Sequence, residues 1–283
     1  MIYILLSILL ISFNNVLWKR NLENTTISFL VAYRALFTSL VSFGLLLYFY
    51  GLTVFNDVPI FKITLGSIFG VIGLFNMLTV VKKASLQWLG IYSLLGIVFT
   101  STYFWLFEEL NLKKSVLGLL LIVIGFVFYI FSNRENNIKI SLKQHALLAI
   151  MTFSFSLSSL IHWKNLTTNI PTLLILSNQE FVVFFTASIF TLFKRKSIEI
   201  KKQIKNYFFR VIAMGLIIFL ALLCNFLGLK ITNPIVSSVL FLASPLTTIL
   251  FSALFFKEKL TLKNSFAILI IAFGAYILHY FSA

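Results

Sequence analysis

Ten runs of apolar residues, separated by short polar breaks, constrain the fold of this 283-residue chain more than any other feature. A helix needs about 20 largely apolar residues to cross the roughly 30 Å of a bilayer core, and about 17 are tolerated. The runs are Ile2–Leu17, Ile27–Tyr50, Ile63–Val81, Leu86–Phe107, Ser115–Phe131, Ala146–Trp163, Thr172–Phe193, Tyr207–Leu229, Pro234–Phe256 and Ser265–Phe281. They are continuously apolar, without the alternation of a transmembrane β-strand. The sequence therefore predicts an all-α polytopic membrane protein with ten transmembrane helices.

The composition indicates an integral membrane protein. Hydrophobic residues make up 60% of the chain and charged residues 11%, whereas a soluble domain carries roughly 25% charged residues. We expect the inner (plasma) membrane of a bacterium. The net charge of +15 does not indicate nucleic-acid binding, because the basic residues fall in short loops and no basic run is interleaved with stacking aromatics. The first run lacks a basic start and a cleavage site, so it is interpreted as a span rather than a signal peptide.

A recurring Trp-Lys pair marks an internal repeat. Trp18-Lys19 recurs 145 positions later as Trp163-Lys164. Further matches, at separations of 145 or 149 positions, are Arg34 with Gln179, Asn76 with Asn225, Glu109 with Glu258, and Gly125 with Gly274. These matches predict two five-helix repeats, residues 1–135 and 136–283, within one membrane domain. Because five is odd, the second repeat enters the membrane from the opposite side, which is the inverted-repeat architecture of many secondary transporters.

The stretch from Leu227 to Leu278 resembles the signature region of EamA-type carriers in the drug/metabolite transporter superfamily. Its elements are Gly228-Leu229-Lys230-Ile231-Thr232, then Pro245, then Glu258-Lys259-Leu260-Thr261 and a helix ended by glycine. The first repeat carries a degraded version, with Gly96 in place of the proline and "EELN" at Glu108–Asn111. The resemblance implies a ten-span carrier but not its substrate, because family members move amino acids, nucleotide sugars, triose phosphates and other metabolites.

Two charged residues lie well inside the predicted spans. Arg34 is about seven residues into the second run and Glu180 about eight into the seventh, where a charge costs about 2.5–3.5 kcal/mol on insertion scales. Because inverted repeats bring them towards the midplane from opposite faces, we expect them to form a central charge pair or to bind the two ends of a zwitterion. The alternative is that neighbouring polar groups satisfy each charge for packing alone.

Neutral polar and aromatic residues supply further candidates for a substrate cavity. The amides are Asn14, Asn15, Asn76, Asn178, Gln179 and Asn225, and the rings are Trp88, Tyr92 and Trp163. The repeat predicts that Asn76 and Asn225 lie symmetrically about the cavity. The alternatives are that the amides bond neighbouring helices, at about 0.6 kcal/mol each, and that the rings pack or face lipid. Trp18 and Trp163 are expected to anchor their spans at the two membrane interfaces.

These features favour an alternating-access carrier that exports or exchanges a small polar metabolite such as an amino acid. Coupling to protons or to a counter-substrate is compatible with Glu180, the one acid inside a span. The alternative is a polytopic enzyme acting on lipid-linked substrates, which would need clustered acid and base groups; only the scattered Glu108, Glu109 and Glu258 are present. No P-loop, nucleophile motif or His/Glu cluster is visible, so neither enzymatic activity nor a cofactor or metal is expected. We expect a monomer or a homodimer.

The charge distribution and the family resemblance predict opposite orientations of the chain in the membrane. The loops after the first, third, fifth, seventh and ninth runs carry 17 Lys and Arg residues, including Arg210 at the start of the eighth run, against five in the opposite loops. The positive-inside rule then places both termini outside the cytoplasm, whereas the family resemblance implies cytoplasmic termini. We give precedence to the charge count, because it is a property of this chain. A terminal reporter that is active in only one compartment should therefore report the outer side.

Overall fold

A computed structural model describes residues 2–56, 58–107, 116–134, 140–194, 197–232, 240, 243–257 and 261–282. In these ranges the chain forms ten α-helices and one short 3-10 helix, η1 (Leu52–Phe55), and no β-strand. The helices are α1 (Ile2–Leu22), α2 (Ile27–Tyr50), α3 (Ile60–Val81), α4 (Leu86–Phe107), α5 (Val116–Arg134), α6 (Leu142–Thr167), α7 (Thr172–Lys194), α8 (Ser197–Ile231), α10 (Ala243–Phe256) and α11 (Leu262–Ser282). The predicted all-α fold is confirmed.

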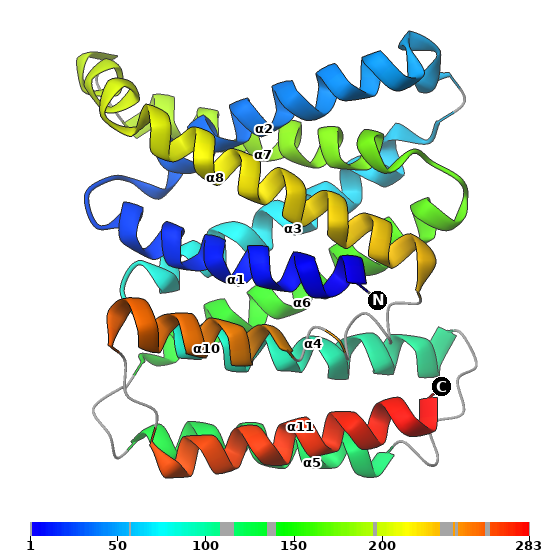
Figure 1. The fold of residues 1–283 in the computed structure, drawn as a ribbon, viewed down its shortest axis with the longest axis vertical. Helices are drawn as coiled ribbons and strands as arrows, with labels where there is room; N and C mark the ends of the chain where they lie inside the picture. The colour runs from blue at the N-terminus through cyan, green and yellow to red at the C-terminus, as the bar shows by residue number, and fades with distance from the viewer. Residues whose placement is uncertain are drawn as a thin grey trace.

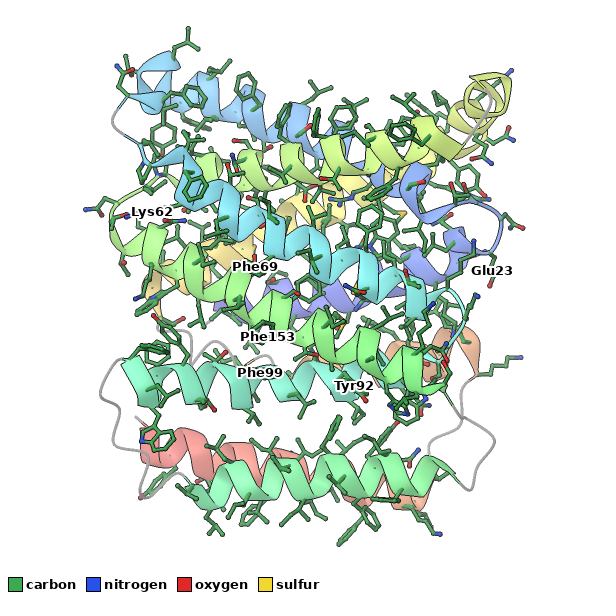
Figure 2. All side chains as sticks on the ribbon, turned by 180° about the vertical axis from the view of Figure 1, so that it is seen from behind. Glu23, Lys62, Phe69, Tyr92, Phe99 and Phe153 are labelled. Carbon is green, nitrogen blue, oxygen red and sulfur yellow. The ribbon has the colours of Figure 1, made fainter. Side chains whose placement is uncertain are left out.

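Seven of the helices, α1 to α4 and α6 to α8, are long and apolar enough to cross a membrane. Within the described residues, α5, α10 and α11 offer shorter apolar stretches. Large apolar side chains cover the outside; Phe193 is 86% exposed and Phe61 is 78% exposed. Figure 2 shows Phe69, Phe99 and Phe153 at mid-length on one face of the bundle, with Glu23 and Lys62 at its opposite ends. An apolar belt between polar ends is the surface that a bilayer requires, so the chain is an integral membrane protein.

Several helices extend beyond the predicted spans. Helix α1 continues past Leu17 to Leu22, α6 begins before Ala146 and continues past Trp163, and α8 begins at Ser197 rather than Tyr207. The predicted ends were set by charged residues. A helix can continue through lysine and arginine because their long stems carry the charge out to water.

Two parts of the predicted pattern fall outside the residues that the structure describes. The predicted ninth span begins at Pro234, but residues 233–239 and 241–242 lie outside the described residues, and α10 covers the remainder. The motif glutamates Glu108, Glu109 and Glu258 also lie outside the described residues.

The helices all run from one end of the bundle to the other, and α2 and α8 slope in opposite directions across it (Figure 1). Helix α2 packs on α7, α3 on α6, α1 on α8, and α5 on α11, while α10 contacts α1 and α4. At one end, Lys82 Nζ donates to the Thr25 carbonyl oxygen at 2.8 Å, and Thr25 Oγ1 donates to Gln203 Oε1 at 3.0 Å. These bonds join the α1–α2 loop to α3 and α8, and we call this the basic end because Lys19, Lys82 and Lys205 lie there. Both chain termini lie at the opposite end, the far end (Figure 1).

Candidate functional site

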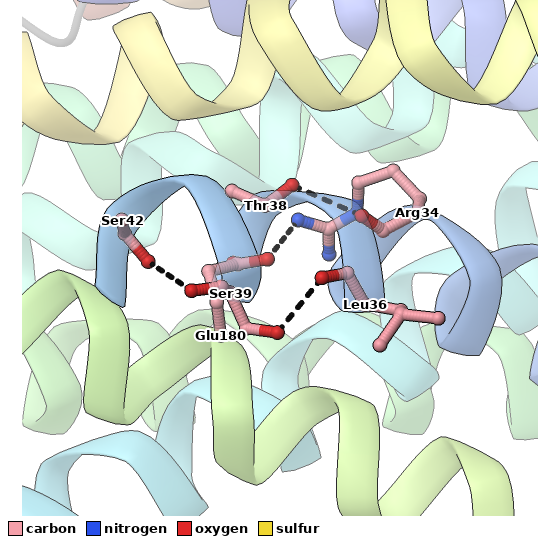
Figure 3. A network of polar contacts seen from close by, with 6 residues as sticks. All are labelled: Arg34, Leu36, Thr38, Ser39, Ser42 and Glu180. Carbon is pink, nitrogen blue, oxygen red and sulfur yellow. Dashed lines mark hydrogen bonds and ion pairs between the residues drawn. The ribbon is translucent and has the colours of Figure 1, made fainter. Parts of the chain in front are cut away.

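The two charges inside the spans meet in the centre of the bundle. Arg34 on α2 donates from Nη1 to Glu180 Oε2 on α7, as Figure 3 shows. Both side chains are 2% exposed. The contact follows from the packing of α2 along α7, which brings an arginine from one helix to the level of a glutamate on the other. Each charge therefore compensates the other in a region where neither is hydrated.

The hydroxyl groups of α2 near Arg34 are satisfied within their own helix. Thr38 Oγ1 donates to the Arg34 carbonyl oxygen at 3.0 Å, and Ser42 Oγ donates to the Ser39 carbonyl oxygen at 3.1 Å (Figure 3). Ser39 Oγ bonds in the same way to the Leu36 carbonyl oxygen at 2.9 Å. This back-bonding lets a small polar face of α2 lie in the interior without partners on other helices, so the Arg34 side chain remains available to Glu180.

Trp18 forms a wall of the same site, and its prediction as an interfacial anchor was wrong. Its side chain is 1% exposed, and the Arg34 Cζ atom lies 5.7 Å from the centroid of its ring. Because α1 continues to Leu22, Trp18 sits a full turn inside the helix rather than at its end. A tryptophan face is the best aromatic partner for a guanidinium, and the attraction is stronger where water is excluded.

A cavity of about 300 Å³ lies beside the ion pair. Residues from α1, α2, α3, α4, α6, α7, α8 and α10 line it, including Trp18, Arg34, Met77, Thr100, Thr152, Phe155, Ser158, His162, Gln179, Glu180, Asn225 and Thr248. Among the described residues, its charged lining residues are one arginine and one glutamate. The wall is thus a mixture of apolar side chains, hydroxyls and amides with balanced charge, which is the usual make-up of a small-molecule pocket.

Several polar atoms in the wall lack a bonding partner. Among the described residues, Arg34 Nε, Asn14 Oδ1, Asn225 Oδ1 and both ring nitrogens of His162 are buried without a hydrogen bond. All four residues line the cavity. Native proteins leave few buried polar atoms unpaired, and such atoms usually point to an unseen water or ligand. Their concentration here indicates that the cavity takes a polar occupant.

Six of the predicted site residues line this cavity and five do not. Those that line it are Arg34, Glu180, Gln179, Asn225, Asn14 and Asn15. The residues that lie away from it are Asn76, Asn178, Trp88, Tyr92 and Trp163.

Each of these five side chains has another hydrogen-bond partner or packing contact. Asn76 Nδ2 donates to the Ile72 carbonyl oxygen of its own helix at 2.8 Å. Asn178 joins α7 to α3, because its Oδ1 accepts from Ser67 Oγ at 2.8 Å and its Nδ2 lies 3.1 Å from Thr64 Oγ1.

The aromatic candidates pack near the helix ends. The Trp88 ring lies edge-on against that of His145, with centroids 5.3 Å apart, and Tyr92 Oη is 2.6 Å from His145 Nδ1. Trp163 packs against Phe104 with centroids 5.3 Å apart. The rings therefore join neighbouring helices at the cavity's periphery.

His162 is one of the cavity residues that the sequence interpretation missed. It was placed near the end of a span, but α6 continues to Thr167 and leaves His162 1% exposed. The sequence signal for this position is the repeated Trp-Lys motif. His162 directly precedes Trp163 in the second copy, as Leu17 precedes Trp18 in the first.

The helical bundle and its internal cavity define a polytopic membrane protein with a candidate small-molecule site. Residues 142–280 match the model of the EamA-like transporter family. The match covers the second half of the chain, agrees with the resemblance seen in the sequence, and suggests a membrane transporter of the drug/metabolite transporter superfamily. Among curated proteins, none matches the sequence significantly.

A solved structure supports the whole fold. This structure, named only as "Crystal structure of protein", matches with a TM-score of 0.68 over 98% of this chain and 98% of its own, at 17% identity. At that identity the similarity extends to the fold alone, which includes both halves of the chain.

Proposed function

We propose that the protein is a secondary transporter that exports or exchanges a small, polar, net-neutral metabolite, such as an amino acid, by alternating access. The observation that carries the proposal is the Arg34–Glu180 pair, buried in the wall of a cavity whose remaining polar atoms lack partners. Such a pair is costly in a bundle that needs only to pack. We place the carrier in the bacterial plasma membrane, as a monomer or a homodimer.

Alternating access is proposed from an inverted repeat, and the helix contacts support the repeat. If α1 to α5 correspond to α6, α7, α8, α10 and α11, the contact of α1 with α8 has a counterpart in that of α6 with α3. Likewise α1 with α10 matches α6 with α4, and α2 with α8 matches α7 with α3. The α2–α7 and α5–α11 pairs join each helix to its own counterpart. In such carriers the repeats rock about a central site.

The charge balance of the cavity supports a net-neutral substrate. A substrate with a net charge would leave that charge uncompensated in a region of low dielectric, whereas a zwitterion can share its two ends between Arg34 and Glu180. The volume also fits a small solute: about 300 Å³ corresponds to roughly ten water molecules.

Uptake of labelled metabolites into proteoliposomes tests the proposed function. The panel contains neutral, acidic and basic amino acids, and each is measured with and without a pH gradient. We expect saturable uptake of at least one neutral amino acid and none of the charged ones. Selective uptake of anions or cations would contradict the argument from charge balance, and the pH gradient reports whether protons are coupled.

The two repeat-related asparagines should differ in their effect on transport. Asn225→Ala removes an amide from the cavity wall, so we expect the KM for the substrate to rise about two- to ten-fold, the loss of one neutral hydrogen bond. Asn76→Ala removes an amide that bonds its own helix and should leave KM unchanged. Equal effects of the two substitutions in the uptake assay would contradict this assignment of the cavity wall.

A further inference from the structure

We propose that His162 and Asn225 form a second polar subsite of the cavity, which binds an uncharged hydroxyl or amide group of the substrate. The inference rests on the proposed function and narrows its substrate class. Arg34 and Glu180 would hold the charged ends of a zwitterion, and the second subsite would recognise its polar side chain. The transported amino acid would then be one such as serine, threonine, asparagine or glutamine.

The His162 ring is held in place by close packing. Its centroid lies 5.3 Å from that of Phe226 on α8, with the two planes inclined by 74°. On the α3 side it lies against Gly66, where an added Cβ would come within 2.7 Å of His162 Cε1. The two ring nitrogens would lie 3.0 and 3.1 Å from that Cβ, so the glycine leaves the space that this edge of the ring occupies.

Both nitrogens of this ring are unused. They are buried and lack a hydrogen bond within the described residues, although His162 lines the cavity. The Gln179 side chain lies close enough to interact with the ring, although no hydrogen bond of normal geometry joins the two. A neutral imidazole offers one donor and one acceptor. A hydroxyl or amide group is also both donor and acceptor, so it matches the ring in either tautomer.

Asn225 brings a second unpartnered group to the same region. Its Oδ1 atom is buried without a hydrogen bond, and the residue lines the cavity. It precedes Phe226 on α8, the residue that packs on the His162 ring, so the two polar side chains approach from α6 and α8 at a similar depth.

The subsite lies towards the far end of the bundle. His162 is five residues before the end of α6, and Phe226 is five before the end of α8, or about 8 Å at 1.5 Å per residue. Arg34 instead lies seven residues from the start of α2 at the basic end, and its partner Glu180 lies eight residues, or about 12 Å, from the start of α7 at the far end. The two subsites are therefore at different depths, as an elongated substrate with a charged end and a polar end requires.

Paired substrates of equal shape test the subsite. Threonine and valine differ by a hydroxyl in place of a methyl, so the ratio of their kcat/KM values in proteoliposome exchange reports hydrogen bonding to the side chain. We expect the wild-type protein to prefer threonine and His162→Leu to reduce that preference about ten-fold. Asn165→Leu is the matched control, because Asn165 is buried on the same helix with an unpartnered Nδ2 but does not line the cavity. It should keep the wild-type ratio.

The outcomes separate this inference from the proposed function. Exchange of valine as fast as threonine by the wild type, or an unchanged ratio in His162→Leu, overturns the subsite and leaves the carrier intact. Absence of exchange for every neutral amino acid overturns both.

A spectroscopic measurement covers the case in which His162→Leu fails to fold. In ¹⁵N-histidine-labelled wild-type protein, threonine should shift the ring resonances of His162 and valine should not. His145, which bonds Tyr92 at the basic end, serves as the internal reference. A His162 signal that responds to neither amino acid overturns the subsite.

Discussion

Glu180→Gln is expected to abolish transport and to destabilise the protein. The substitution leaves the Arg34 guanidinium buried beside a neutral amide, and removal of one partner of a buried ion pair costs about 3–5 kcal/mol. Uptake into proteoliposomes measures the loss of transport, and a thermal melt of the detergent-solubilised protein measures the loss of stability. The amount of protein in the membrane fraction checks that the variant is still inserted.

The double variant Arg34→Met/Glu180→Leu distinguishes binding from packing. It removes both charges, and an apolar pair of similar size is often as stable as a buried ion pair, so the melting temperature should return towards the wild-type value. Transport should stay absent, because the groups that bind the substrate are gone. Normal transport by the double variant would show that the pair serves packing alone.

Arg34→Lys should also weaken transport strongly. A lysine keeps the positive charge but lacks the planar fork of donors that arginine offers to a carboxylate. Arg34 donates from Nη1 to Glu180 and retains an unpartnered Nε. We therefore expect a lysine at this position to bind either Glu180 or the substrate, but not both. The uptake assay should show a KM at least ten-fold higher. Unchanged KM and kcat would refute a direct role for the guanidinium.

Gly274→Ala is expected to reduce stability strongly at the contact between α5 and α11. An added Cβ would lie 2.7 Å from the Gly118 carbonyl oxygen, 2.8 Å from Leu121 Cβ and 3.0 Å from the Ile122 backbone nitrogen. These are backbone or near-backbone atoms, so the two helices must move apart. Overpacking of this kind costs about 1–3 kcal/mol, which a thermal melt or a denaturant titration in detergent measures.

Gly44→Ala is the matched control for that substitution. Gly44 lies within α2, and an added Cβ would meet no atom within 4 Å. Alanine is favoured over glycine inside a helix by about 1 kcal/mol, so this variant should be at least as stable as the wild type. An equal loss of stability in the two variants would contradict the close approach of α5 and α11.

The sequence predicts the helical membrane fold and the central charges well, because each stands out from its surroundings in the sequence. Apolar runs stand out from polar breaks, and single charges stand out within apolar runs. An arginine or a glutamate inside an apolar run is conspicuous, and the helix packing then brings Arg34 and Glu180 together. The role of Trp18 and His162 was not predictable in the same way. Both lie next to the predicted ends of spans, and their burial depends on how far α1 and α6 continue past lysine.

Which neutral amides face the cavity depends on the rotation of each helix about its axis, and a sequence repeat does not determine that rotation. The predicted repeat makes Asn76 and Asn225 equivalent, yet of the two Asn225 lines the cavity. Asn178 bonds to α3, and its neighbour Gln179 lines the wall. A difference of one residue rotates a side chain by about 100° around a helix. Packing against neighbouring helices sets that rotation, and the apolar runs carry no strong periodicity to predict it.

Counterflow in proteoliposomes tests alternating access, the central claim, most directly. Vesicles are loaded with a high concentration of an unlabelled neutral amino acid from the uptake panel, and entry of a trace of the labelled form is followed. The binding site of an alternating-access carrier reorients across the membrane faster with substrate bound than when empty. The label should therefore enter loaded vesicles faster than empty ones and accumulate transiently above its external concentration. Entry at the same rate into loaded and empty vesicles, without an overshoot, would contradict the account.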